Sequence, residues 1–114
     1  MNADVMMDAA ALDSRAEAAA ILLKSLANPV RLKMLCAMVD GEQSVGAIAA
    51  QVGVRETVIS QHLMRLRAEG IVTYRRQGTT VFYALADGPA RAVMRTLYEV
   101  FCGPNAHPQA SWRY

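Results

Sequence analysis

Before residue 70, apolar side chains recur at the spacing of an amphipathic helix in four separate segments. The helices predicted from this spacing span residues 11–27, Val30–Val39, Val45–Val52 and Glu56–Glu69. Asn28 is a good N-cap and precedes a proline suited to the first helical position, and Ser44 is placed to cap the third helix. The expected core-facing residues, helix by helix, are Leu12, Ala16, Ala19, Leu23 and Leu26; Leu32, Leu35, Cys36 and Val39; Val45, Ile48, Ala49 and Val52; and Val58, Ile59, Leu63 and Leu66.

After Gly70 the pattern changes to two strand-like runs and a last helix. The runs Ile71–Arg76 and Thr80–Leu85 flank Gln77-Gly78-Thr79, a short connection typical of a β-hairpin, and a helix is expected over Ala90–Phe101. The short third helix, tight turn and longer fourth helix match a helix-turn-helix, and the hairpin that follows matches a wing. The sequence therefore predicts a mainly α winged helix-turn-helix of order helix, helix, helix, helix, strand, strand, helix.

The length of 114 residues allows one domain. We expect a flexible leader at 1–10, a DNA-binding and dimerisation domain at 11–103, and a tail at 104–114. A monomer of this size buries only about two-thirds of its unfolded-chain surface. A homodimer would bury more, and the alanine-rich first helix suits close packing.

The net charge of +2 does not indicate a nucleic-acid partner, but the distribution of charge does. Residues 1–20 hold four carboxylates and one arginine, whereas residues 55–76 hold five arginines and two carboxylates. Hydrogen-bonding side chains on the exposed face of the fourth helix suit the donor and acceptor pattern of a DNA major groove. The candidate DNA-binding residues are Arg55, Thr57, Ser60, Gln61, His62, Arg65, Arg75 and Arg76. The alternative is a merely solvated helix face, with His62 packed where the helix meets the wing.

Other classes of protein fit poorly. The longest uncharged runs have 12 and 13 residues, short of the about 18 apolar residues that span a bilayer, and the N-terminus is acidic where a signal peptide is basic. We therefore expect a cytoplasmic protein with no membrane partner and with free thiols. A dithiol enzyme is disfavoured because the chain lacks Cys-x-x-Cys and no motif indicates a Ser, His and Asp cluster, so no catalytic residue and no cofactor is predicted. A charge of only +2 disfavours a DNA-packaging protein.

Three motifs carry a resemblance to a known family: "SLANPVRLKML", "SQHLMRLRAEGIV" and "RRQGTTVFYAL". Together they resemble the ArsR/SmtB family of dimeric winged-helix repressors. The resemblance implies double-stranded operator DNA as partner, with Thr57, Ser60, Gln61 and His62 on the recognition helix, and a dimer interface built by the first and last helices. Members often have Ser at the position of Arg55, where it caps the helix. Either Thr57 caps a helix that starts later, or Arg55 has become a phosphate contact.

Family members commonly respond to metals, but this chain offers few ligands. The segment "EQSVGAIAA", where a thiolate motif would lie, has no Cys, and the last helix has only Glu99. His107 lies in the tail. No metal site is therefore predicted, and a repressor responsive to arsenite, cadmium or zinc remains the alternative.

Two cysteines lie in distinctive contexts, Cys36 in "KMLCAMVDGEQSVG" and Cys102 in "LYEVFCG". Both contexts resemble the persulfide-sensing SqrR and BigR subgroup, which is related to HlyU. The resemblance implies that sulfide, persulfide or oxidants link the two thiols by a disulfide or polysulfide bridge and that the repressor then leaves DNA. The simpler alternative makes Cys36 a small core residue and Cys102 an ordinary helix end. Arg31 and Lys33 lie near Cys36 in sequence, so we expect Cys36 to be the attacking thiol.

Overall fold

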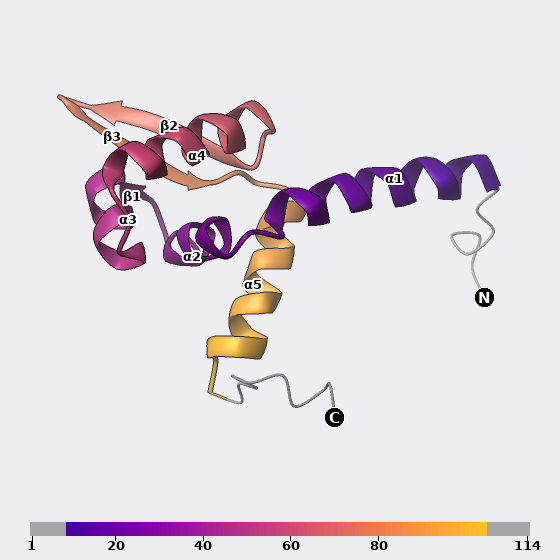
Figure 1. Ribbon diagram of the computed structural model, residues 1–114. Coiled ribbons are helices and arrows are strands. Elements are labelled where there is room, and N and C mark those ends of the chain that lie inside the picture. The colour runs from indigo at the N-terminus through magenta and orange to yellow at the C-terminus, as the bar shows by residue number, and fades with distance from the viewer. Residues whose placement is uncertain (1–8, 105–114) are drawn as a thin grey trace.

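The computed structural model describes residues 9–104 and confirms the predicted order of elements, with one strand added (Figure 1). Ala9 and Ala10, which the sequence assigned to the leader, form the start of the first helix. The rest of the expected leader and all of the expected tail except Pro104 lie outside the described residues. The elements are α1 (Ala9–Leu26), α2 (Pro29–Ala37), β1 (Gln43–Ser44), α3 (Val45–Val52), α4 (Glu56–Ala68), β2 (Val72–Gln77), β3 (Thr80–Leu85) and α5 (Pro89–Cys102).

Local capping sets the helix boundaries as the sequence predicts. The Asn28 side chain accepts a hydrogen bond from the Arg31 backbone N–H at 3.1 Å, and the Ser44 hydroxyl accepts one from the Ala47 N–H at 3.1 Å. Gly53 ends α3 in the left-handed conformation at φ 79°, which a residue with a side chain rarely adopts. These caps satisfy backbone groups that a helix cannot pair internally, so they fix where α2 and α3 begin.

The wing is the outer part of a three-stranded antiparallel sheet of order β1-β3-β2, not an isolated hairpin. In β1, Gln43 pairs with Tyr83 and Ser44 with Phe82. The two residues of β1 are too few to show an alternating pattern, which is why the sequence did not reveal it. Side chains alternate between the faces of a strand, so neighbouring residues of β2 point to opposite sides of the sheet.

The core lies between α2, α3, α4, the base of the sheet and α5. Its predicted face on α4 is largely confirmed, because Ile59, Leu63 and Leu66 are fully buried, but the fourth predicted residue, Val58, is only half-buried. On α2 the prediction is partly wrong: Leu35 and Val39 are buried, but Leu32 and Cys36 are only half-buried. The core cluster consists of Leu26, Met34, Leu35, Met38, Val39, Ile48, Ala49, Ile59, Leu63, Leu66, Ile71, Val72, Leu85, Ala90 and Met94.

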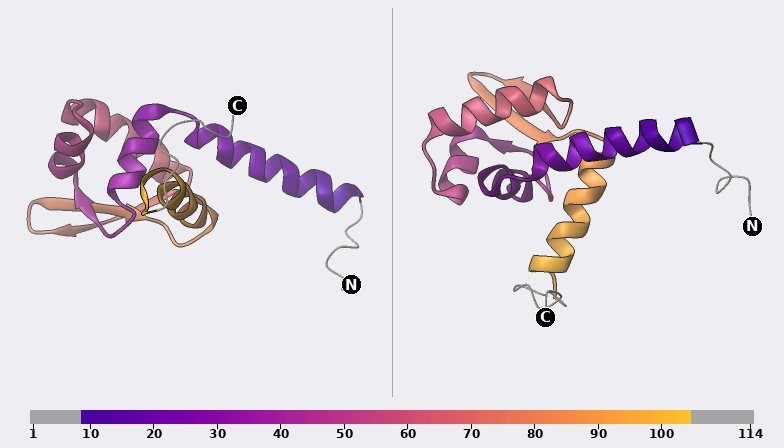
Figure 2. Two further views of the ribbon diagram at one scale, coloured as in Figure 1. Left: turned by 90° about the horizontal axis from the view of Figure 1, so that it is seen from below. Right: turned by 45° about the vertical axis from the view of Figure 1, so that its right-hand side comes forward.

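Two helices extend away from this core. In the views of Figures 1 and 2, most of α1 projects beyond the rest of the chain, and α5 leaves the core in a different direction. The predicted inner face of α1 is therefore only partly right for a single chain: Leu26 is buried as predicted, but Leu12 and Leu23 are 53% and 56% exposed and Ala16 and Ala19 are exposed. The radius of gyration of 16.4 Å exceeds the roughly 13 Å of a compact domain of this length.

None of the helices that the structure describes is both long and apolar enough to cross a bilayer.

Candidate DNA-binding surface and thiol pair

The exposed face of α4 carries most of the predicted DNA-binding residues. Thr57, Ser60, Gln61 and Arg65 are exposed, on the side of α4 away from its buried residues. The helix begins at Glu56, so Thr57 is not its cap. Arg55 occupies the cap position in an extended conformation and makes no side-chain capping bond, which leaves its guanidinium available for another contact.

Met64 lies on the same face of α4 and was not predicted from the sequence. Its side chain is 71% exposed, and together with Gln61, Arg65 and Ala68 it lines an open depression of about 400 Å³. Helical spacing would have placed it there, since it lies three residues after Gln61. It was not predicted because only hydrogen-bonding and charged side chains were taken as candidates for DNA binding.

His62 lies at the junction of α4 with α2, not at the wing. The Arg31 guanidinium donates a long hydrogen bond from Nε to His62 Nδ1 at 3.4 Å. Burial lowers the pKa of His62, and the nearby cations Arg31 and Arg65 lower it further, so the ring is neutral at pH 7. His62 therefore accepts a contact within the protein, and its neutral ring leaves Nε2 as the protonated nitrogen.

Arg31 also ties the end of α1 to this junction. Its Nη1 donates to the Ser25 carbonyl oxygen at 2.9 Å and to the Ser25 hydroxyl at 3.3 Å. The Ser25 hydroxyl in turn donates a short hydrogen bond to the carboxylate of Glu69, which follows the last residue of α4. One polar network thus joins α1, α2 and both the middle and the end of α4.

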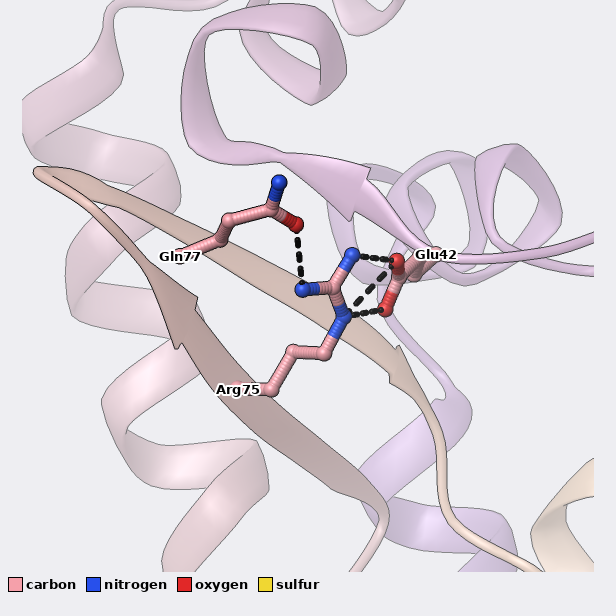
Figure 3. A network of polar contacts seen from close by, with 3 residues as sticks. All are labelled: Glu42, Arg75 and Gln77. Carbon is pink, nitrogen blue, oxygen red and sulfur yellow. Dashed lines mark hydrogen bonds and ion pairs between the residues drawn. The ribbon is translucent and has the colours of Figure 1, made fainter.

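The two wing arginines have different surroundings. Arg75 is held by Glu42, in the segment before β1, as Figure 3 shows: Nε donates to both carboxylate oxygens at 2.9 and 2.8 Å, and Nη2 donates to one of them. Its Nη1 donates to the Gln77 side chain at 2.7 Å, and its guanidinium carbon lies 4.8 Å from the centroid of the Phe82 ring. The hydrogen bonds from Arg75 lower the pKa of Glu42, and the carboxylate raises the pKa of Arg75. Both groups are therefore charged at pH 7, and the carboxylate offsets the arginine.

Arg76 lies next to Arg75 on β2 and so points to the opposite face of the sheet. Within residues 9–104 it has no hydrogen-bond or ion-pair partner, and its side chain is exposed. On the same face, Arg67 of α4 stacks over the Tyr74 ring at 3.9 Å from its centroid, which fastens the end of α4 to the base of the wing. The structure therefore separates the two predicted wing contacts into one paired and one unpaired cation.

The two cysteines come together although they are far apart in sequence. Cys36 of α2 and Cys102 at the end of α5 are both free thiols and line one open cavity of about 390 Å³. Its other lining residues are Leu32, Lys33, Ala37 and Gln51. Cys102 is exposed, whereas Cys36 is half-buried.

The environment of Cys36 contradicts the expected reason for its reactivity. Burial raises the pKa of the Cys36 thiol, and the neighbouring Cys102 raises it further. Of the two cations close in sequence, Arg31 is directed to Ser25 and His62 at the other end of α2, whereas Lys33 lines the same cavity as Cys36. Even with Lys33 in this cavity, the pKa of the Cys36 thiol is raised. Cys36 is thus less often a thiolate at pH 7 than an ordinary cysteine, so the expectation that it attacks first loses its physical basis.

Within residues 9–104, no group of three or more His, Cys, Asp or Glu side chains is arranged to hold a metal ion. His107, which the sequence analysis considered as a ligand, lies outside the described residues.

The helix-turn-helix of α3 and α4, with the adjoining sheet as wing, defines a winged helix-turn-helix DNA-binding protein. Residues 28–74 match the family described as "Bacterial regulatory protein, arsR family". The chain is 44% identical to the Biofilm growth-associated repressor of Agrobacterium fabrum, over 82% of this chain and 80% of that protein. The chain therefore belongs to the ArsR family of bacterial regulatory proteins.

Solved structures agree with this assignment. The transcriptional repressor BigR from Xylella fastidiosa is 42% identical, with a TM-score of 0.75 over 80% of this chain and 90% of that one. Reduced HlyU from Vibrio cholerae is 35% identical, with a TM-score of 0.76 over 80% of this chain and 96% of that one. The predicted similarity to BigR and HlyU is thus confirmed, and the chain is a DNA-binding transcriptional regulator, not an enzyme.

Proposed function

We propose that this regulator is a repressor that binds operator DNA as a reduced homodimer and releases it when a disulfide or polysulfide bridge links Cys36 to Cys102. Reactive sulfur species, such as persulfides, or oxidants form the bridge. The observation that carries the proposal is the shared cavity: thiols from α2 and α5, distant in sequence, face the same open space of about 390 Å³. A purely structural role for either cysteine would not explain why the two thiols line the same cavity.

The DNA-binding half of the proposal rests on α4 and the wing. Thr57, Ser60 and Gln61 present hydrogen-bonding groups from the first half of α4, and the N-terminal residues of a recognition helix contact base edges. Arg55 before α4, Arg65 on α4 and Arg76 on the wing supply phosphate contacts. We assign Arg75 a different role, because Glu42 already holds and offsets its charge.

The homodimer rests on apolar surface that one chain leaves uncovered. Ile21 and Leu23 of α1 are 70% and 56% exposed, and Val100 and Phe101 of α5 are each 37% exposed. Large apolar side chains left exposed on two helices indicate surface that contacts another protein. Packing of α1 and α5 against a second copy would cover it and set two α4 helices at the spacing of a two-fold operator.

An organic persulfide is the only co-reactant needed to form a disulfide bond between Cys36 and Cys102. The more exposed Cys102 thiolate attacks the outer sulfur of an organic persulfide, takes that sulfur and releases a thiol. The Cys36 thiolate then attacks the Cys102 sulfur of this new persulfide and releases hydrogen sulfide. The protein loses two electrons and gains one disulfide. A second persulfide molecule supplies the extra sulfur of a trisulfide, and the open cavity has room for longer bridges.

A route from the bridge to DNA follows from the contacts of α2. The same helix carries Cys36 toward its end and Arg31 at its start, and Arg31 contacts His62 of the recognition helix. A bridge to α5 would restrain α2 and thereby shift the helix that positions α4. A coupling of about 1–3 kcal/mol is enough to change operator affinity about 5- to 150-fold.

The experiment measures operator binding of the reduced protein and then of samples treated with an organic persulfide, hydrogen peroxide, glutathione disulfide, zinc, cadmium or arsenite. Intact mass is recorded for each sample. We expect loss of binding together with a linked Cys36–Cys102 species after persulfide. Unchanged affinity with both thiols unlinked would refute the sensing mechanism, and release by a metal alone would favour the metal-responsive alternative.

Two variants serve as matched controls, because Cys36 and Cys102 are the chain's two cysteines. Cys36→Ser and Cys102→Ser should each bind the operator as tightly as the reduced wild type and stay bound after persulfide. A Cys36→Ser protein that cannot bind DNA even when reduced would assign Cys36 a structural role.

A further inference from the structure

Met64 is an exposed apolar side chain that neither the core nor the expected subunit contacts explain. At 71% it is the most exposed of the large hydrophobic residues that the structure describes. Leu12, Ile21 and Leu23 lie on α1, and Val100 and Phe101 on α5, the helices assigned to the dimer. Tyr74 lies on β2, where Arg67 stacks over its ring. Met64 alone lies on the exposed face of the recognition helix.

The geometry of α4 aims Met64 at the same partner as the polar candidates. Residues three, four or seven positions apart share a helix face, and Met64 lies three residues after Gln61 and seven after Thr57. Ile59, Leu63 and Leu66 occupy the opposite, buried side. The depression bordered by Gln61, Met64, Arg65 and Ala68 is open, so nothing within the described chain covers the methionine.

We propose that Met64 reads the 5-methyl group of a thymine in each operator half-site. This inference rests on the proposed function, in which α4 lies in the major groove. The thymine methyl is the apolar group that a base pair presents there, and apolar side chains recognise it by contact. The neighbouring Gln61 suits adenine, which it can meet with both a donor and an acceptor. Together the two side chains specify an A·T-containing step, and Arg65 holds the adjacent phosphate.

The size of the effect follows from the group removed. Covering one methyl group is worth a factor of about four in affinity, so loss of the contact in both half-sites weakens binding about sixteenfold. The flexible thioether of methionine can follow the methyl group without a fixed fit, and leucine preserves the apolar contact. Because Met64 is exposed, its replacement leaves the core and the thermal transition unchanged.

The experiment uses the full-length reduced protein and an operator duplex selected by that protein from randomised DNA. Each thymine is replaced in turn by deoxyuridine, which removes the methyl group and keeps every hydrogen-bonding group. Affinities are measured for the wild type, Met64→Ala and Met64→Leu, with Gln61→Ala as the control for a neighbouring polar contact.

We expect one thymine per half-site at which deoxyuridine weakens wild-type binding about fourfold, has no effect on Met64→Ala, and still weakens Met64→Leu. Gln61→Ala should keep the sensitivity to deoxyuridine. The inference is overturned if Met64→Ala retains the wild-type response at every thymine, or if no thymine responds. Failure of the wild type to select any operator would instead overturn the proposed function itself.

Discussion

The difference between the two wing arginines leads to a prediction about salt dependence. Arg76 is exposed and unpaired within the described residues, whereas Glu42 holds Arg75 on the other face of the sheet. Each phosphate that a protein neutralises contributes about 0.9 to the slope of log affinity against log salt. A dimer in which Arg76→Ala removes one phosphate contact per subunit should therefore show a slope shallower by about 1.8. Arg75→Ala should leave the slope close to the wild-type value.

The assay is a titration of operator and of non-specific duplex at four or more salt concentrations by fluorescence anisotropy. Glu42→Gln is the matched test of the pairing, because it frees Arg75 without removing it and should steepen the slope. Thermal unfolding of each variant controls for loss of the wing. Equal slopes for the Arg75→Ala and Arg76→Ala proteins, both shallower than wild type, would refute the separation of roles.

Three further predictions follow from the surroundings of single residues. Because burial lowers the pKa of His62, the folded protein prefers the neutral ring, so its free energy of unfolding should fall as the pH drops below about 6.5. A pH titration of the stability of His62→Gln, which keeps an acceptor for Arg31, should lack this loss. At limiting reagent, alkylation should modify Cys102 before Cys36, and the rate of Cys36 alkylation should go on rising above the pH at which an ordinary thiol ionises. Peptide mass mapping that finds Cys36 alkylated before Cys102 would contradict the raised pKa of Cys36. Ile21→Glu should shift the protein from dimer to monomer in sedimentation velocity, since a buried unpaired carboxylate costs several kcal/mol; an unchanged dimer would exclude that part of α1 from the interface.

The parts of the fold that depend on local chemistry could be predicted from the sequence. Asn28 and Ser44 begin their helices because each side chain caps a backbone group three residues away, which is a local interaction. Strand β1 could not be predicted, because two residues carry no period and its pairing with β3 depends on the folded chain. The periodicity of α1 was real, but of the surface that it indicates only Leu26 is buried in the chain's own core.

In the candidate site, too, features set by local sequence could be predicted, and features that depend on contacts between distant residues could not. The exposed face of α4 follows from helical spacing, so its polar residues could be predicted. The apolar Met64 on the same face was not predicted. The pairing of Arg75 with Glu42 joins residues 33 positions apart, and no spacing rule reveals it. The effect of Arg31 on Cys36 was misjudged for a related reason: proximity in sequence says little about the direction of a side chain, and Arg31 turns toward His62.

The central claim is that a bond between Cys36 and Cys102 lowers operator affinity. The most direct measurement compares the Kd of two preparations of one protein sample for the same operator at one salt concentration. One preparation is fully reduced, and the other is linked within each subunit, as intact mass and peptide mapping verify. The account predicts at least a fivefold weaker Kd for the linked protein, restored by dithiothreitol, with both preparations still dimeric. Equal Kd values for the two preparations would contradict it.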